Sequence, residues 1–235
     1  MSSPSLSPRL AMCASLARPG KRMADIGTDH GYLPVYLVAQ GVCPTAIAAD
    51  IRPGPLSRAR ETVKQAGMDS RISLRLGDGL SPVRPEETDD VAITGMGGET
   101  IAAILAAAPW CKDGRYRLIL QPMSKPEDLR EFLFANGFAL ETERAVREGN
   151  RLYTVIRAAY HPQKAAEQAK RPAARYCGEL DPADPDGAAF LLRQAKRIES
   201  AAAALRKAGV TDRAERLEQT AHAIRQRTGT DNTSL

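Results

Sequence analysis

Residues 23–31 read Met-Ala-Asp-Ile-Gly-Thr-Asp-His-Gly and contain the side chains of this chain that are best suited to chemistry. Apolar residues around a carboxylate, followed by glycines, predict a strand that runs into a tight ligand-holding turn. Such a turn follows the first strand of doubly wound α/β folds, where nucleotide-like ligands bind. Asp29 distinguishes it from the dinucleotide version, because a carboxylate repels a pyrophosphate but attracts an ammonium and a sulfonium. The turn therefore favours S-adenosyl-L-methionine over NAD.

Three later strand ends have matching residues. Asp50 closes the second expected strand, 25 residues after Asp25, where a carboxylate commonly receives two ribose hydroxyls. Asp78 closes the third, where it can accept from an adenine amino group, and Gly95-Met96-Gly97-Gly98 closes the fourth with little bulk beside the sulfonium. Aspartates and glycines also populate turns for conformational reasons, so each position alone is ambiguous. Their occurrence at four successive strand ends favours a cofactor site.

Asp29, His30 and Gln121 are the candidates for contact with the reacting groups. Asp29 and His30 could equally cap the helix expected after them. Gln121 closes the fifth expected strand, where it could hydrogen-bond a purine edge or merely end the strand. A ring nitrogen attacks with a free lone pair and the cofactor brings its own electrophile, so no base is needed. Positioning is then the main contribution of the protein, and the lack of a Ser/His/Asp set does not argue against catalysis.

Strand and helix patterns alternate regularly over the first two-thirds of the chain. Strands are expected at 22–26, 45–50, 71–76, 90–94 and 117–121. Helices are expected at 32–39, 55–65, 99–107 and 127–135, with a short helix in 10–17 beside the first strand. Two last strands, 138–147 and 151–158, form a hairpin around Glu148-Gly149-Asn150. This order predicts an α/β, Rossmann-like sheet of the class I methyltransferase type over residues 1–159. A dehydrogenase would more usually continue into a second nucleotide-binding half.

The composition changes after about Tyr160, where Ala, Gln, Lys, Arg and Glu replace β-branched residues. Apolar residues at three- and four-residue spacing predict helices at 188–208 and 212–227 that pair as an α-helical hairpin. We therefore expect a second, helical domain over residues 160–235. Its helices contain nine Lys/Arg and four Asp/Glu between 188 and 227. A solvated surface on a packing hairpin is the favoured interpretation, and contact with RNA is the alternative.

The bulk composition excludes several classes of protein. A net charge of +5 permits a polyanionic partner without requiring one. No apolar run approaches the roughly 20 residues of a membrane span, and the stretch 10–17 is too short for a secretory signal. The cysteines are scattered, without metal-ligand spacing, which predicts a reduced, cytoplasmic compartment and no metal site. They are Cys13, Cys43, Cys111 and Cys177.

Five stretches of this chain resemble the bacterial tRNA (adenine-22-N1)-methyltransferases. They are Leu6-Ser7-Pro8-Arg9-Leu10, the string from Ala24 to Pro34, Gly77-Asp78-Gly79-Leu80, Gly95-Met96-Gly97-Gly98 and Leu118-Ile119-Leu120-Gln121-Pro122. The resemblance covers most of the expected sheet domain, and the string Asp-Ile-Gly-Thr-Asp-His-x-Tyr-Leu-Pro is highly specific. The helical part is similar to the coiled-coil appendage of that family. S-adenosyl-L-methionine as methyl donor and N1 of adenine 22 in tRNA as acceptor are what the resemblance implies.

The resemblance also assigns roles to particular residues. It implies that Asp29 and His30 lie beside the reacting groups, and that Arg9 meets either the methionine carboxylate or an RNA phosphate. Cofactor contacts are expected from Asp25, Gly27, Asp29, Asp50, Ile51, Asp78, Gly79, Gly95 and Met96. RNA contacts are expected from Arg9, Arg193, Lys196 and Arg197.

One departure from the family pattern keeps alternatives open. The family usually has Gln-Pro-Asn after the fifth strand, whereas position 123 is Met here. If that asparagine holds the base, Gln121 or backbone groups must replace it. A methyltransferase acting on another RNA or a small amine therefore stays open, as does a non-catalytic RNA-binding protein that retains the cofactor fold. We expect tRNA as the partner and favour a monomer, although the sequence leaves the oligomeric state open.

Overall fold

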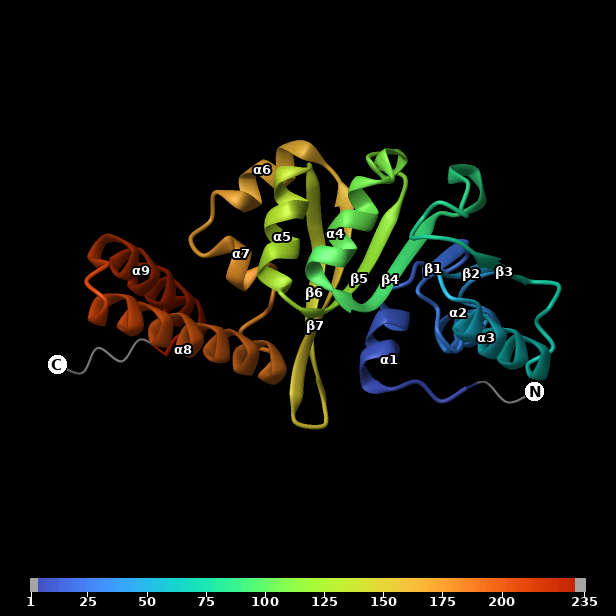
Figure 1. The fold of residues 1–235 in the computed structure, drawn as a ribbon, viewed down its shortest axis with the longest axis horizontal. Coiled ribbons are helices and arrows are strands. Elements are labelled where there is room, and N and C mark those ends of the chain that lie inside the picture. The colour runs from blue at the N-terminus through green and yellow to red at the C-terminus, as the bar shows by residue number, and fades with distance from the viewer. Residues whose placement is uncertain (1–3, 231–235) are drawn as a thin grey trace.

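The computed structural model describes residues 4–230 and contains a seven-stranded sheet. The strand order is β3-β2-β1-β4-β5-β7-β6, in which β3, β2, β1, β4 and β5 are parallel and β7 is antiparallel to both its neighbours. Two C-terminal helices lie side by side at one end of the molecule (Figure 1). The expected α/β, Rossmann-like sheet with a C-terminal helical hairpin is confirmed.

The strands and helices follow the chain in alternation through the sheet region. The strands are β1 (Met23–Ile26), β2 (Ala46–Asp50), β3 (Ile72–Leu76), β4 (Asp90–Gly97), β5 (Arg117–Ser124), β6 (Phe138–Glu148) and β7 (Arg151–Tyr160). The helices are α1 (Pro8–Ser15), α2 (Tyr32–Ala39), α3 (Pro53–Gln65), α4 (Gly98–Ala106), α5 (Pro126–Ala135), α6 (Pro162–Ala169), α7 (Ala174–Cys177), α8 (Pro185–Lys207) and α9 (Thr211–Thr228). Two short 3₁₀ turns are η1 (Pro85–Glu87) and η2 (Pro109–Cys111).

The structure differs from the expected elements in three main ways. Strands β4 and β5 each extend three residues further, to Gly97 and Ser124, because they stay paired through two irregular steps. Helix α3 begins at Pro53 rather than at position 55. Helices α6 and α7 were not expected, since prolines and charged residues interrupt the hydrophobic pattern there. The division into domains 1–159 and 160–235 stays a prediction, and its residues 1–3 and 231–235 lie outside the described part.

Helices cover both faces of the sheet, which explains why its central strands show no alternation of apolar and polar residues. Every residue of β1 and β2 is buried, as expected for parallel strands covered on both sides. Ala46 and Ala48 pack in the cluster that includes residues of α1 and α2. Ile47 and Ala49 pack in the cluster that includes residues of α4 and α5. The sheet is thus the middle of three layers (Figure 1).

The edge strand β6 is covered by side chains that imitate a neighbouring strand. The amide of Gln168 accepts from the N–H of Leu140 at 2.9 Å and donates to its carbonyl at 2.8 Å. Asp186, in the first turn of α8, accepts from the N–H of Arg147 at 2.9 Å. An uncovered edge invites pairing with another chain. The segment after the sheet therefore protects this edge at both ends of β6.

Arg130 of α5 and Glu143 of β6 form an ion pair that is fully buried, with 2.7 Å between Nη2 and Oε1. Nη1 of Arg130 also donates to the carbonyls of Arg175 and Tyr176 in α7. Glu143 Oε2 accepts from the N–H of Glu179 at 3.1 Å. Buried charges are stable only when they are paired and hydrogen-bonded. The chain after the sheet therefore completes the environment of this pair.

The helical hairpin is held by a small apolar cluster and by salt bridges. Phe190, Leu191 and Ile198 of α8 pack with Ala145 of β6 and Ile224 of α9. Salt bridges join the two helices, Arg206 with Glu218 at 2.7 Å and Arg225 with Glu199 at 2.5 Å. The hairpin is thus attached to the sheet at its base. Among residues 4–230, no helix is long and apolar enough to cross a membrane.

The buried ion pair gives a direct test of this attachment. Arg130→Met leaves the Glu143 carboxylate buried without its partner, so we expect the free energy of unfolding to fall by about 3–5 kcal/mol. The double variant R130M/E143M removes both charges and should recover most of that loss. Urea unfolding followed by circular dichroism measures both. A loss below about 1 kcal/mol for R130M alone would contradict the importance of the pair.

Candidate active site

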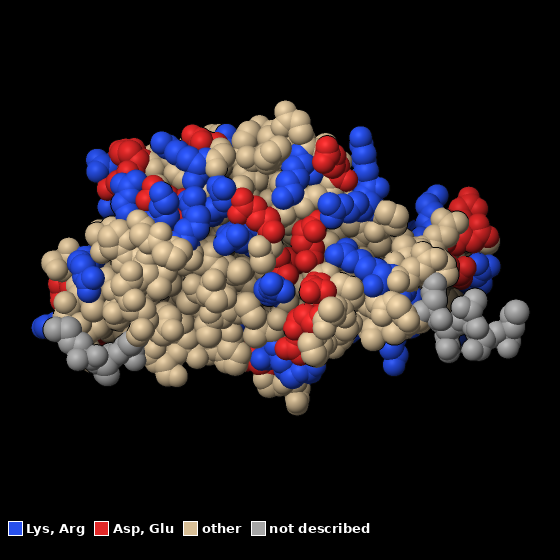
Figure 2. Space-filling model, turned by 180° about the vertical axis from the view of Figure 1, so that it is seen from behind, with Lys and Arg blue, Asp and Glu red and all other residues tan. Residues whose placement is uncertain are grey.

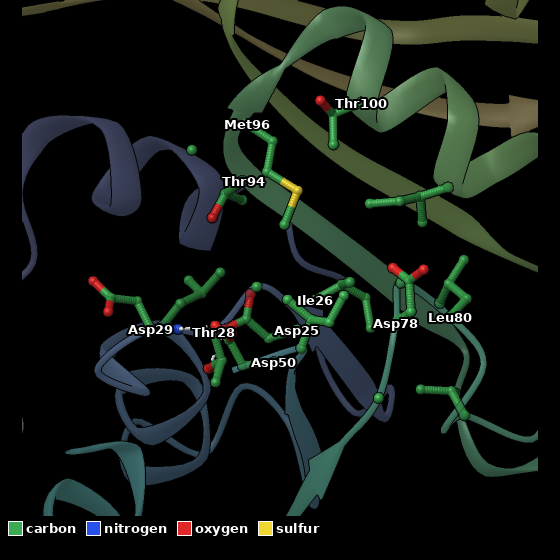
Figure 3. A pocket seen from close by; sticks show the side chains of 18 of the residues that line it. Asp25, Ile26, Thr28, Asp29, Asp50, Asp78, Leu80, Thr94, Met96 and Thr100 are labelled. Atoms are coloured by element: carbon green, nitrogen blue, oxygen red, sulfur yellow. Dashed lines mark hydrogen bonds between the residues drawn. The ribbon is translucent and has the colours of Figure 1, made fainter. Parts of the chain in front are cut away.

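A cavity of about 1160 Å³ opens at the carboxyl ends of the parallel strands. Residues that follow β1, β2, β3 and β4 line it, together with residues of α1 and α4. It lies at the point where the strand order reverses, between β1 and β4, which is where ligands bind in open α/β sheets. Figure 3 shows the side chains of these strand ends converging on it. The fold therefore brings the four expected strand ends together.

Asp25 is the most unusual polar residue of the cavity, because it is buried at the end of β1 with only half of its carboxylate satisfied. Thr28 donates its hydroxyl to Oδ2 at 2.6 Å (Figure 3). Oδ1 has no hydrogen-bond partner among residues 4–230. Burial, with a smaller contribution from the charge of Asp50, raises the pKa of Asp25 to about 6. A buried oxygen without a donor is a site prepared for a donor or a cation from a ligand.

Asp50, at the end of β2, is held in place by backbone groups. Its Oδ1 accepts from the N–H of Arg52 at 2.9 Å, and its Oδ2 accepts from the N–H of Asp29 at 3.3 Å. These bonds fix the carboxylate between the two loops that follow β1 and β2. Ile51, the next residue, is 58% exposed at the mouth of the cavity. An exposed isoleucine beside a fixed carboxylate suits the flat face of a base attached to a ribose.

Asp29 adopts a left-handed backbone with φ 51°, a conformation that is strained for residues other than glycine and that concentrates at functional sites. Its carboxylate pairs with Arg58 of α3 at 2.9 Å and lies 3.7 Å from His30. The capping interpretation of Asp29 and His30 is wrong, because the residue that caps α2 is Gly31 and no side chain bonds there. The His30 ring stacks on Tyr32, with centroids 5.2 Å apart.

The opposite end of the cavity is mainly apolar. Asp78 is exposed there and lines the wall after β3. Gly79 has φ +51° and packs against Ile104, which a Cβ at this position would meet at 3.1 Å. The walls are completed by apolar residues of the loop after β3, of α4 and of η2, which are Leu80, Val83, Ala103, Ala107 and Trp110. An apolar slot with one carboxylate at its rim suits a purine that has an amino group.

Gly27 and Gly95 add no side chains at the centre of the cavity, and the space beside Gly27 is taken by Met96. Gly27 has φ +71°, and a Cβ there would lie 2.1 Å from the terminal methyl of Met96. The Met96 side chain points from the end of β4 toward the end of β1 (Figure 3). Gly95 has φ +74° and likewise adds no side chain. The backbone at the end of β4 can therefore approach a ligand closely at Gly95.

Gln121 lies outside the cavity lining and is completely buried. Its Oε1 accepts from Arg9 Nη1 at 2.8 Å and from the N–H of Gly95 at 3.1 Å. Its Nε2 donates to the carbonyl of Pro122 at 2.9 Å. Direct contact with a base would require these bonds to break. The residue from this strand end that does line the cavity is Met123, which is 37% exposed.

The residues expected to contact RNA fall into two groups. Arg193 and Lys196 are exposed on α8. Arg197 instead pairs with Glu127 of α5 at 2.5 Å, and Arg9 pairs with Glu148 at 3.0 Å. The hairpin therefore uses part of its positive charge to bind the sheet domain. Seen from behind, Lys and Arg are interspersed with Asp and Glu over the surface rather than gathered in one patch (Figure 2).

Sequence reasoning missed several residues that shape the site. Thr28 donates to Asp25, and Arg58 pairs with Asp29. Tyr32 stacks on His30. Trp110 lines the apolar end of the cavity and packs edge-on against Tyr116. Thr28 and Tyr32 stand inside the motif and could have been suspected. Arg58 and Trp110 come from elements that meet the cavity only after folding. No group of His, Cys, Asp and Glu able to hold a metal ion occurs within the described part of the chain.

Comparisons with known proteins agree with this geometry. Residues 6–156 match the family described as "Methyltransferase domain". A segment of 151 residues is 42% identical to the tRNA (adenine(22)-N(1))-methyltransferase of Bacillus subtilis (strain 168). It covers 64% of this chain and 63% of that protein, so the chain spans a little less than two thirds of this curated relative in the alignment.

Two crystal structures are similar over nearly the whole chain. The B. subtilis M1A22 tRNA methyltransferase TrmK aligns with a TM-score of 0.82 and 32% identity, over 94% of this chain and 99% of that one. Streptococcus pneumoniae Sp1610 in complex with S-adenosyl-L-methionine aligns with a TM-score of 0.76 and 29% identity, over 93% and 100%. The likeness therefore includes the C-terminal helices as well as the sheet.

The half-satisfied carboxylate gives a pH-dependent prediction. Because the pKa of Asp25 is raised from 3.8 to about 6 by burial, the folded state holds its proton more tightly than the unfolded state. The wild-type protein should therefore lose about 2–3 kcal/mol of stability through this group as the pH rises from about 4 to about 6. Asp25→Asn removes that contribution, so its stability relative to wild type should improve over the same range. Urea titrations of both proteins at pH 4, 5, 6 and 7 measure the difference, and parallel curves would contradict it.

Proposed function

Because the chain belongs to the methyltransferase-domain family, and within it to the bacterial tRNA (adenine-22-N1)-methyltransferases, we propose that it methylates N1 of adenine 22 in tRNA with S-adenosyl-L-methionine as donor. The observation that carries the proposed donor is the buried Asp25, which lines the cavity with one oxygen unpaired, together with three further aspartates. A cationic donor matches that environment, whereas the pyrophosphate of a dinucleotide does not.

The residues present fit the proposed donor at each of its parts. Asp25 Oδ1 needs a hydrogen-bond donor, which an ammonium provides. The fixed carboxylate of Asp50 suits two ribose hydroxyls, and Asp78 stands at the rim of the apolar slot that suits adenine. Gly95 leaves room at the end of β4, where the nearest atom to an added Cβ would be Arg9 Nη1 at 4.0 Å. When bound, S-adenosyl-L-methionine supplies an electrophilic methyl group.

The part of the protein in the reaction is to hold the acceptor in line and to stabilise charge. Adenine N1 attacks with its own lone pair, so no side chain has to remove a proton beforehand. The purine ring becomes positively charged when N1 is methylated. Asp29 is an exposed carboxylate, paired with Arg58, that lines the cavity beside the stacked rings of His30 and Tyr32. We propose that these three residues receive the base, by stacking and by favourable electrostatics.

Adenine N1 is inaccessible in a paired base, so the nucleotide must leave its stack before it can react. Unstacking costs a few kcal/mol, which contacts to the RNA backbone must offset. Arg193 and Lys196 are exposed on α8, the helix whose Arg197 reaches Glu127 near the carboxyl end of β5. We propose that these two exposed cations hold RNA phosphates while the base enters the cavity. The cytoplasmic location stays a prediction.

A pair of transcripts tests the proposed reaction. A tRNA transcript with adenine 22 and its guanine-22 variant are incubated with labelled S-adenosyl-L-methionine. We expect methylation of the first alone, at N1, as mapped by mass spectrometry of the nucleosides. Labelling of both transcripts, or of another base, would indicate a different acceptor. Tight binding of the donor by calorimetry without turnover on any tRNA would indicate a non-catalytic protein.

A second experiment tests the division of the arginines on α8. In R193M/K196M two phosphate contacts are lost, so tRNA binding should weaken. The plot of the logarithm of the tRNA association constant against the logarithm of the salt concentration should become less steep by roughly 1.5–2. Arg197→Met is the matched control, because Arg197 is bound to Glu127; its salt slope should match wild type. Cofactor affinity should not change in either variant. Equal salt slopes for R193M/K196M and wild type would contradict the proposed contacts.

A further inference from the structure

The end of β4 contains a backbone donor that the sheet itself does not satisfy. Thr94 pairs with Gln121 and Met96 pairs with Pro122, so Gly95 is an extra residue at a break in the ladder between β4 and β5. Its N–H is accepted instead by Oε1 of the buried Gln121 side chain at 3.1 Å. A side chain thus replaces the missing strand partner at the one residue of this strand end that has φ +74°.

Arg9 controls the orientation of that side chain. Its Nη1 donates to the same Oε1 at 2.8 Å, so two donors converge on one oxygen. The amide is thereby turned so that Nε2 faces the carbonyl of Pro122. Without Arg9 the oxygen would keep only one donor, and rotation of the amide would bring its N–H₂ group against the N–H of Gly95. Hydrogen bonds to charged donors are the stronger ones.

Arg9 is itself held from three sides. Glu148, at the hairpin between β6 and β7, accepts from the Arg9 backbone N–H and from Nε, both at 3.0 Å. The guanidinium lies over the ring of Tyr153, 5.3 Å from its centroid. Nη1 also approaches Met123 Sδ at 3.4 Å. The side chain is thus fixed in one geometry, and its charge is already matched by a carboxylate, as expected of a residue that positions others rather than of a mobile phosphate contact.

We infer that Arg9 is a positioning residue for the cofactor site, which acts through Gln121 on Gly95. The inference rests on the proposed function, since Gly95 is one wall of the cavity assigned to the methyl donor. It changes the role expected for Arg9, which also lines the cavity, from contact with the methionine carboxylate or an RNA phosphate to support of a strand end. Gln121 takes the same role, because its bonds lie within the protein. The N-terminal helix α1 is thereby connected to Gly95, in the wall of the cavity.

Cofactor affinity without RNA is the decisive measurement. Calorimetry with S-adenosyl-L-homocysteine compares wild type with R9M, Q121M and the double variant R9M/Q121M. Each single change should weaken binding by roughly ten- to thirtyfold, the loss typical of a charge-assisted or buried hydrogen bond. The double variant should bind S-adenosyl-L-homocysteine no more than about threefold more weakly than whichever single variant binds it less tightly. The reason is that the two residues act as one unit. Arg9→Lys should not restore binding, since an ammonium cannot bond Glu148 and Gln121 with one planar fork.

Other outcomes would overturn the inference. If R9M binds the cofactor as well as wild type while its tRNA salt slope falls by about one, Arg9 is a phosphate contact. If the losses of R9M and Q121M multiply in the double variant, Arg9 acts on the cofactor independently of Gln121.

Two further variants keep the result interpretable. Arg60→Met changes an exposed arginine of α3 and should leave cofactor affinity unchanged. Glu148→Gln keeps an acceptor for Arg9 but removes the charge, so it should weaken binding in the same direction by a smaller factor, even if R9M folds poorly. A thermal melt of each variant reports folding. A failure of the proposed function itself appears separately, as donor binding without methyl transfer to tRNA.

Discussion

The site depends on the reversal of strand order between β1 and β4. β1 connects onward to β2 on one side, and the chain returns past β3 to place β4 on the other, so the segments after β1 and β4 leave the sheet in opposite directions. The space between them cannot be filled by either segment. Gly27 and Gly95 border this space without side chains, and Met96 reaches from β4 toward Gly27.

The two buried aspartates of the cavity differ in how many hydrogen bonds their carboxylates accept from the protein. Asp50 is bonded by two backbone N–H groups, whereas Asp25 is buried with an oxygen left over. Burial without a partner destabilises an ionised carboxylate and raises its pKa. A cationic ligand relieves that penalty, so the free protein is less stable at neutral pH than it would be with a neutral residue there. The feature of Asp25 that favours binding of a cationic donor therefore also lowers the stability of the free protein.

Several arginines bind partners within the protein, whether they are buried, like Arg130, or exposed, like Arg197. Arg130 completes a buried pair with Glu143, Arg9 holds Gln121, and Arg197 ties α8 to α5. Net positive charge therefore overstates the surface available to RNA, as the mixture of signs on the rear face also indicates (Figure 2). The pair with Glu143 is completed by carbonyls of α7. Removing the C-terminal region would therefore disturb the sheet domain, and single substitutions on α8 are the cleaner probe of RNA binding.

The sequence by itself determined the alternating strand and helix order, the hairpin after β5, the two long C-terminal helices and the four strand ends that meet at the cavity. These follow from local patterns, since buried strands, turn residues and amphipathic helices are written in neighbouring residues. The capping interpretation of Asp29 was settled only by the backbone at Gly31. The roles of Arg9, Gln121 and Arg197 depended on residues 112, 26 and 70 positions away. Only the tertiary structure decides such contacts. The type of a charged residue and its neighbours in the sequence do not specify which distant carboxylate or amide it will contact after folding.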